Sequence, residues 1–211
     1  MKLKPLLISL PLIGLCSVDA AITQFTDRAA FLSALSSDYL STDFSSLTPG
    51  DQGATSTSTP FGPGPTLIIE TRNSTNTAAG DNLWVSDIGD LNTALGASTT
   101  YSDQLRFSSA GGFFAIGGDW FLGDIDDNYL SGSVVLTFSD NSTFTINSTS
   151  QANSFRGFIS DAPLTSVLLS PGDPGNVAGW VTVDNLVVPE PSAALLSGIA
   201  GLGVVLRRRR I

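Results

Sequence analysis

The stretch SGSVVLTFSDNSTFTIN, residues 131–147, decides the fold. In its first half, Val134, Leu136 and Phe138 fall on one side of an extended chain, and the residues between them are mostly polar. This period of two predicts a β-strand with one face in the core. The turn residues at 139–142 and the second alternating run predict an antiparallel hairpin. The chain is therefore expected to build antiparallel sheet from short strands.

Similar runs, bounded by Gly, Pro, Asn and Asp, continue on both sides of this hairpin. No helical segment separates them, which excludes parallel βαβ units. The sequence predicts a mainly β fold, an antiparallel β-sandwich resembling a jelly roll. Residues 48–65, rich in Pro, Gly, Ser and Thr, are expected to form an irregular loop. The other runs are TLIIET, DQLRFSS, GGFFAIGGDWF, SFRGFIS, LTSVLLS and WVTVDNLVV.

One short helix is expected before the strands, in FTDRAAFLSALSSD. Thr26 is a suitable N-cap, and Phe31 and Leu35 lie on one apolar helical face. The run GGFFAIGGDWF is apolar on both sides, which predicts a central strand with Phe114 buried. We expect Phe31 and Leu35 to cover this strand.

The N-terminal residues 1–20 are typical of a secretory signal peptide. A basic start, MKLK, precedes an apolar run, and small residues lead to an expected cleavage site after Ala20. Cys16 is the only cysteine of the chain, so its removal with this segment would leave no disulfide in the mature protein. A lipid anchor on Cys16 is the alternative, but Leu15 is bulky where such a site needs a small residue.

The C-terminal residues separate apolar from basic side chains along the chain. Residues 192–206 carry no charge, and four arginines follow directly: Arg207, Arg208, Arg209 and Arg210. This order predicts a transmembrane helix whose end is held in the cytoplasm. Its fifteen residues rise ~22 Å as a helix, against ~30 Å of hydrocarbon. A transient sorting segment therefore fits better than the alternative, an ordinary permanent anchor.

The triplet Pro189, Glu190 and Pro191, the apolar segment and the arginines resemble, in this order, the PEP-CTERM sorting signal of exopolysaccharide-producing Gram-negative bacteria. The resemblance covers residues 189–211. The runs GGFFAIGGDW, LTFSDNSTFTI and VTVDNLVV also resemble β-sandwich cargo domains joined to that signal, although Asn141 stands where relatives have a glycine turn. The resemblance implies that a membrane peptidase, an exosortase, recognises the triplet. The protein would then pass from an inner-membrane precursor to the cell surface or the medium.

The body, residues 21–188, is strongly acidic. It holds 17 of the 19 acidic residues, four arginines, and no lysine or histidine. Nucleic-acid binding needs phosphate-neutralising bases, so the composition argues against it. Without His, Lys or Cys the usual nucleophile and base pairs cannot be assembled, so no enzyme activity is expected. The sequence therefore indicates a non-catalytic exported protein of the surface or matrix.

An alternative function is a glycan-binding module, associated with exopolysaccharide and stabilised by calcium. Asp124, Asp126 and Asn128 have a spacing that can direct three oxygen ligands at Ca²⁺, and a solvated acidic turn is the other interpretation. Asp184 interrupts an apolar strand, which favours a hydrogen-bonding role over an ion ligand. Aromatic rings can stack on sugars or fill a core, and both interpretations stay open for three candidates: Trp84, Trp120 and Trp180.

Overall fold

The computed structural model describes residues 21–35, 39–53, 55–56, 67–86, 93–98, 100–173 and 179–189. The expected signal peptide and the sorting tail after Pro189 lie outside these ranges. Within them, no helix is long and apolar enough to cross a membrane.

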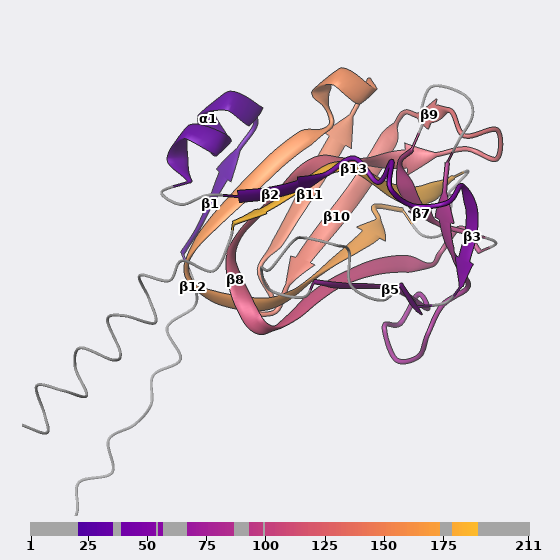
Figure 1. The fold of residues 1–211 in the computed structure, drawn as a ribbon, viewed down its shortest axis with the longest axis horizontal. Helices are drawn as coiled ribbons and strands as arrows, with labels where there is room; N and C mark the ends of the chain where they lie inside the picture. Colours follow the sequence, from indigo (N-terminus) through magenta and orange to yellow (C-terminus); the bar gives the residue numbers. More distant parts are fainter. Residues whose placement is uncertain are drawn as a thin grey trace, which may run out of the picture.

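The described part of the chain is mainly β, as predicted (Figure 1). One α-helix and one 3₁₀ turn accompany the strands. In chain order the elements are β1 (Ile22–Phe25), α1 (Arg28–Ala34), β2 (Tyr39–Thr42), β3 (Gly50–Gly53), β4 (Thr55–Ser56), β5 (Ile68–Arg72), β6 (Leu83–Val85), β7 (Leu95–Ala97), β8 (Gln104–Gly123), β9 (Tyr129–Leu130), β10 (Gly132–Phe138), β11 (Thr143–Ser148), the 3₁₀ turn η1 (Gln151–Asn153), β12 (Phe155–Pro171) and β13 (Trp180–Pro189).

The strands form one 13-stranded sheet in which every named pairing is antiparallel. Its main path runs β11-β10-β12-β8-β13-β7-β6-β3, and the shorter strands pair along its edges. The antiparallel prediction is confirmed. The sandwich stays a prediction, because the hydrogen bonds join all these strands in one sheet. The predicted irregular loop at residues 48–65 was wrong in part, since it contains β3 and β4.

Two long, bent strands organise the sheet. β8 joins the predicted runs DQLRFSS and GGFFAIGGDWF, and β12 joins SFRGFIS and LTSVLLS. Figure 1 shows β8 and β12 curving together. A straight strand from Phe107 to Trp120 would be ~40 Å long, yet their ring centroids lie 5.6 Å apart. β8 therefore turns back, and both of its ends contribute to one hydrophobic core.

The bend corrects the prediction for Phe114. The pairing of β8 with β12 shifts register between Phe113 and Ala115, where residues 160–163 are extra on β12. Phe113 and Ile116 therefore both face the main core, although regular alternation would separate them. Phe114 is 38% exposed, so the prediction of a buried side chain was wrong. The central position of the strand is confirmed, since β8 lies between β12 and β13.

Helix α1 covers the outer face of β8 and β12. Asp27 is its N-cap and accepts a hydrogen bond from the Ala30 amide at 2.7 Å, so the prediction of Thr26 was wrong. Phe31 is fully buried over Gly117 and Gly157, where an added Cβ would overlap its ring. The expected cover by Phe31 is thus confirmed, and Leu35 packs at the edge of the same cluster.

Candidate functional site

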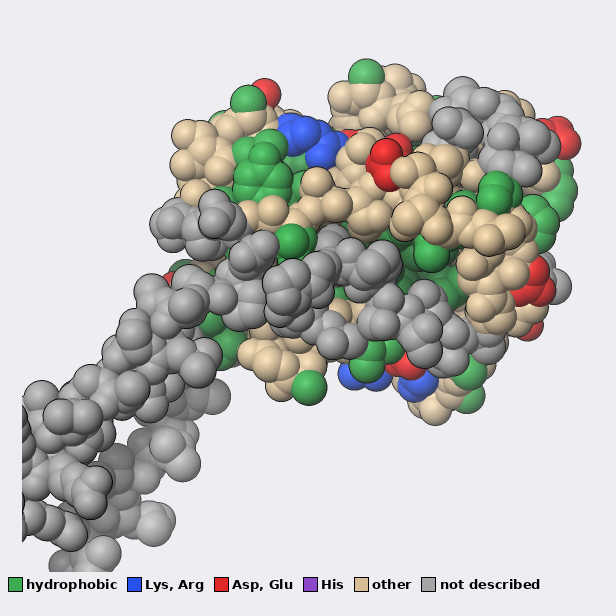
Figure 2. Space-filling model, in the orientation of Figure 1, with side chains coloured by type: hydrophobic (Ala, Val, Ile, Leu, Met, Phe, Trp, Pro, Cys, Tyr) green, Lys and Arg blue, Asp and Glu red, His purple; other side chains and the backbone are tan. Residues whose placement is uncertain are grey.

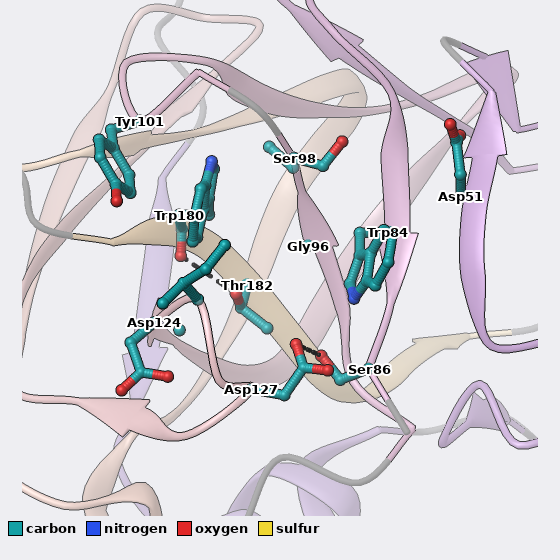
Figure 3. Close-up of a pocket in the computed structure, with 13 residues that line it drawn as sticks. Asp51, Trp84, Ser86, Gly96, Ser98, Tyr101, Asp124, Asp127, Trp180 and Thr182 are labelled. Carbon is teal, nitrogen blue, oxygen red and sulfur yellow. Dashed lines mark hydrogen bonds between the residues drawn. The ribbon is translucent and has the colours of Figure 1, made fainter. Parts of the chain in front are cut away.

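A groove of about 510 Å³ opens on the sheet near β3, β6, β7 and the start of β13 (Figure 3). It combines aromatic rings, small residues and carboxylates. The lining residues are Asp51, Trp84, Ser86, Gly96, Ala97, Ser98, Tyr101, Gly123, Asp124, Ile125, Asp127, Trp180 and Thr182.

The floor of this groove follows from strand register. Asp51 pairs with Trp84, and Trp84 pairs with Gly96. Gly96 in turn pairs with Thr182 on β13. Directly paired residues point to the same side of a sheet, so these side chains share one face. Gly96 has no side chain to fill the middle of the row, and a Cβ there would lie 3.0 Å from the Thr182 Oγ1 atom.

Aromatic rings form the two walls. Trp84 lies between the buried Leu83 and Val85, so strand alternation turns it outward, where it is 38% exposed. Opposite it, Trp180 is half-buried and packs against Tyr101, with ring centroids 4.4 Å apart and the ring planes tilted by 41°. β7 separates the strands of the two tryptophans, which places their backbones ~10 Å apart. The two tryptophans therefore rise from one face of the sheet on either side of β7.

The predicted calcium loop forms the acidic side of the groove. The Asp124 carboxylate accepts hydrogen bonds from the amides of Asp126 and Asn128, both at 2.9 Å. Its side chain thus holds the turn together, while Asp126 is exposed. Within the described ranges, no group of three acidic, histidine or cysteine residues is arranged to hold a metal ion. Calcium binding at this loop stays a prediction.

Asp127 lines the groove together with Asp124 and Ile125 and is the most deeply buried of the three. Its φ of 57° is left-handed, and its side chain is buried against the sheet. The Ser86 hydroxyl lies 3.0 Å from the Asp127 Oδ1 atom and donates to it (Figure 3). Asp51 sits on the other side and accepts a hydrogen bond from the Asn82 amide. Carboxylates therefore flank the aromatic walls at both sides.

The three predicted glycan contacts separate into two groups. Trp84 and Trp180 line the groove, whereas Trp120 does not. Trp120 is fully buried, and its indole N–H donates to the Arg156 carbonyl at 2.9 Å. The prediction of a glycan contact is therefore wrong for Trp120, and the core interpretation holds there.

Several groove residues were not among the sequence-predicted candidates, including Asp51, Ser86, Gly96, Asp127 and Thr182. Asp51 lies in a stretch expected to be irregular, and nothing in its local sequence indicates β3. Gly96 lies in β7, which is too short to show an alternating pattern.

A second polar cluster anchors α1 to the sheet, away from the groove lining. Arg28 forms a 2.7 Å ion pair with Asp119, and Asn185 donates to the same Asp119 oxygen at 3.0 Å. Asp184 accepts hydrogen bonds from the Asn185 amide and side chain. The predicted hydrogen-bonding role of Asp184 is confirmed, although its partner is the next residue.

Burial controls the ionisation of this cluster. Desolvation raises the pKa of Asp184 to about 6, and the nearby charge of Asp119 adds to the shift. Desolvation also raises the pKa of Asp119, while Arg28 and Asn185 oppose that shift. Asp119 and Asp184 are direct partners across β8 and β13, so their charges repel inside the sheet.

Comparison with known proteins adds no family to this description. No family model matches the chain, and no curated protein matches it.

Proposed function

We propose that this chain is a non-catalytic exported protein whose groove binds carbohydrate. The observation that supports the proposal is the pair of aromatic walls, Trp84 on one side and the packed rings of Trp180 and Tyr101 on the other. Sugar rings present C–H faces that pack on aromatic rings, and their hydroxyls bond to carboxylates and hydroxyls. The small floor at Gly96 and the flanking Asp51 and Asp127 supply that combination.

We further propose that the chain reaches the cell surface or the medium through an exosortase. The support is the order of the Pro-Glu-Pro triplet, the uncharged segment and the four arginines. We also propose that the two halves of the bent sheet act as the layers of the β-sandwich expected of such cargo. The contact of Phe107 with Trp120 across the core supports this arrangement.

The proposal of a non-catalytic role is supported by composition. Residues 21–188 contain no His, Lys or Cys. The buried pair Asp119 and Asp184 is held by Arg28 and Asn185 and does not line the groove. A binding module beside exopolysaccharide needs none of the missing groups.

A glycan array followed by calorimetry tests the carbohydrate proposal on the purified full-length protein. We expect binding to at least one class of oligosaccharide. Trp84→Ala should weaken it about tenfold or more, because it removes one stacking wall. Phe114→Ala is the matched control, since Phe114 is equally exposed, at 38%, but lies outside the groove lining. Absence of binding to every oligosaccharide, or equal losses in the two variants, would overturn the proposal.

A further inference from the structure

The charges around the groove have one sign. Its lining contains three carboxylates, Asp51, Asp124 and Asp127, and no lysine or arginine. On the face drawn in Figure 2, basic side chains lie beside α1 and along the lower edge, and the end that carries β3 and β7 shows acidic and hydrophobic groups.

The arginines of the described chain are engaged elsewhere. Arg28 pairs with Asp119, and both Arg72 and Arg106 pair with Glu70. Arg156 donates to the backbone carbonyls of residues 153 and 155. Nothing in the described lining therefore neutralises the groove carboxylates, and an anionic ligand would meet repulsion on both sides.

The aromatic walls, like the carboxylates, favour a positively charged ligand. The face of an indole ring is electron-rich and attracts a cation that lies over it. In Figure 3, Asp124 and Asp127 lie below the two tryptophans, with Asp124 toward Trp180 and Asp127 beside Ser86. A positively charged group near Trp180 would thus face both an aromatic ring and carboxylates, and hydrogen bonds between opposite charges are about twice as strong as neutral ones.

We propose that the groove selects sugars that carry a free, protonated amine, hexosamines without an N-acetyl group, over neutral and acidic sugars. This inference rests on the proposed carbohydrate-binding function. The ring stacks between the walls formed by Trp84 and Trp180, and the ammonium group donates hydrogen bonds to Asp127. N-acetylation removes the charge and uronic acids reverse it, so both changes weaken binding.

Short oligosaccharides of matched length test the selection by calorimetry on the full-length protein. The panel is a glucosamine trimer, its N-acetylated form, a neutral glucose trimer and a galacturonic acid trimer. At low salt we expect the glucosamine trimer to bind about tenfold or more tighter than the neutral trimers, and the uronic acid not to bind. The higher affinity of the glucosamine trimer, relative to the neutral trimers, should shrink as the salt concentration is raised, because salt screens the charges.

Asp127→Asn separates the groove charge from the charge of the whole body. The variant should lose the preference for glucosamine, so that the glucosamine trimer and the neutral trimers bind with similar affinity. Asp161→Asn removes the same charge from an exposed site outside the groove lining and should keep the preference. If Asp127→Asn fails to fold, the comparison of spermidine with the glucosamine trimer on the unmodified protein separates groove recognition from attraction to the acidic body.

The outcomes distinguish this inference from the function beneath it. If neutral and amino trimers bind with equal affinity, and Trp84→Ala weakens the binding of both, the amine selectivity is overturned. Carbohydrate binding itself is then still supported. Spermidine that binds as tightly as the glucosamine trimer also overturns the selectivity, since attraction to general acidity would then explain it. No binding by any trimer overturns both.

Discussion

At the scale of single residues, the environment of a side chain decides its role more than its type does. Trp84 and Trp120 are the same residue, yet one lines the groove and the other fills the core. The sequence left both interpretations open, because a tryptophan fits either place. The prediction for Phe114 failed for a related reason. Alternation predicts which face a side chain occupies only in a regular strand, and the pairing of β8 with β12 shifts register at Phe114.

Asp184 predicts an unusual dependence of stability on pH. Its folded pKa of about 6 lies above the ordinary 3.8, so the folded protein binds the proton more tightly than the unfolded chain does. The stabilisation is full below the ordinary pKa and is lost as the pH rises through about 6. The free energy of unfolding should therefore fall, on the order of 1–3 kcal/mol, between about pH 4 and pH 8.

Chemical denaturation at several pH values measures this effect. Asp184→Asn should flatten the dependence, because the variant has no proton to release. Asp161→Asn, an exposed acid, should leave it unchanged. A wild-type protein that is more stable at the higher pH would contradict the role assigned to Asp184.

Phe31 and Phe114 form a matched pair for a packing test. Phe31→Ala should lower the free energy of unfolding by ~3 to 5 kcal/mol, because it leaves a cavity over Gly117 and Gly157. Phe114→Ala should cost less than ~1 kcal/mol, since its side chain is already partly in solvent. Urea unfolding of both variants checks the pair, and equal losses would refute the described bend in β8.

At the scale of elements, patterns of six or more residues predicted the strands well. The runs at β5, β10, β11 and β13 were all expected, and the two runs in each of β8 and β12 were expected as separate strands. Periodicity identifies extended segments, but it does not show whether two neighbouring segments are separate strands or parts of one bent strand. The short strands β1, β2, β3, β4, β6, β7 and β9 were not predicted, because two to four residues show no period.

The hairpin between β10 and β11 gives a prediction at this scale. Asn141 has a φ of 70°, a left-handed conformation that Asn tolerates and a β-branched residue does not. Asn141→Gly should leave stability nearly unchanged, whereas Asn141→Val should lower it by ~1 kcal/mol or more. Thermal unfolding of the two variants is the measurement. A harmless Asn141→Val would show that the turn can adopt another geometry.

At the scale of the whole molecule, the fold class was predictable and the groove was not. The antiparallel sheet follows from many local patterns that agree. The groove requires Asp51, Trp84, Gly96, Asp127 and Thr182 to meet through long-range pairings. Trp84 and Trp180 were expected as candidates, but their position on facing walls depends on which strands pair, and no local pattern specifies that.

Sorting is a property of the whole chain and is testable as such. If the proposed sorting is correct, replacing all four residues Arg207, Arg208, Arg209 and Arg210 by neutral residues should block processing of the tail and leave the body folded, because the proposal has these charges hold that end in the cytoplasm. The size and location of the protein in a host with an exosortase provide the readout. Unchanged processing would refute the sorting proposal.

Calcium is tested by its effect on global stability. If Asp124, Asp126 and Asn128 bind the ion, the melting temperature should rise with calcium concentration, and Asp126→Ala should abolish the rise. Asp126 is the informative site because it is exposed, whereas Asp124 also holds the turn through two amides. If neither calcium nor a chelator changes the melting temperature, calcium binding is refuted, and the turn is stabilised by its own hydrogen bonds alone.

The position of β13 has a mechanical consequence. This strand begins in the groove at Trp180 and ends at Pro189, the first residue of the Pro-Glu-Pro triplet. It pairs with β8 on one side and with β7 and β2 on the other. A pull between a ligand in the groove and the chain beyond Pro189 would run along this strand, perpendicular to its hydrogen bonds. Tension would then act on the hydrogen bonds of both edges of β13 at the same time and in shear. A tethered molecule is therefore expected to resist drag, because its hydrogen bonds would not break one after another.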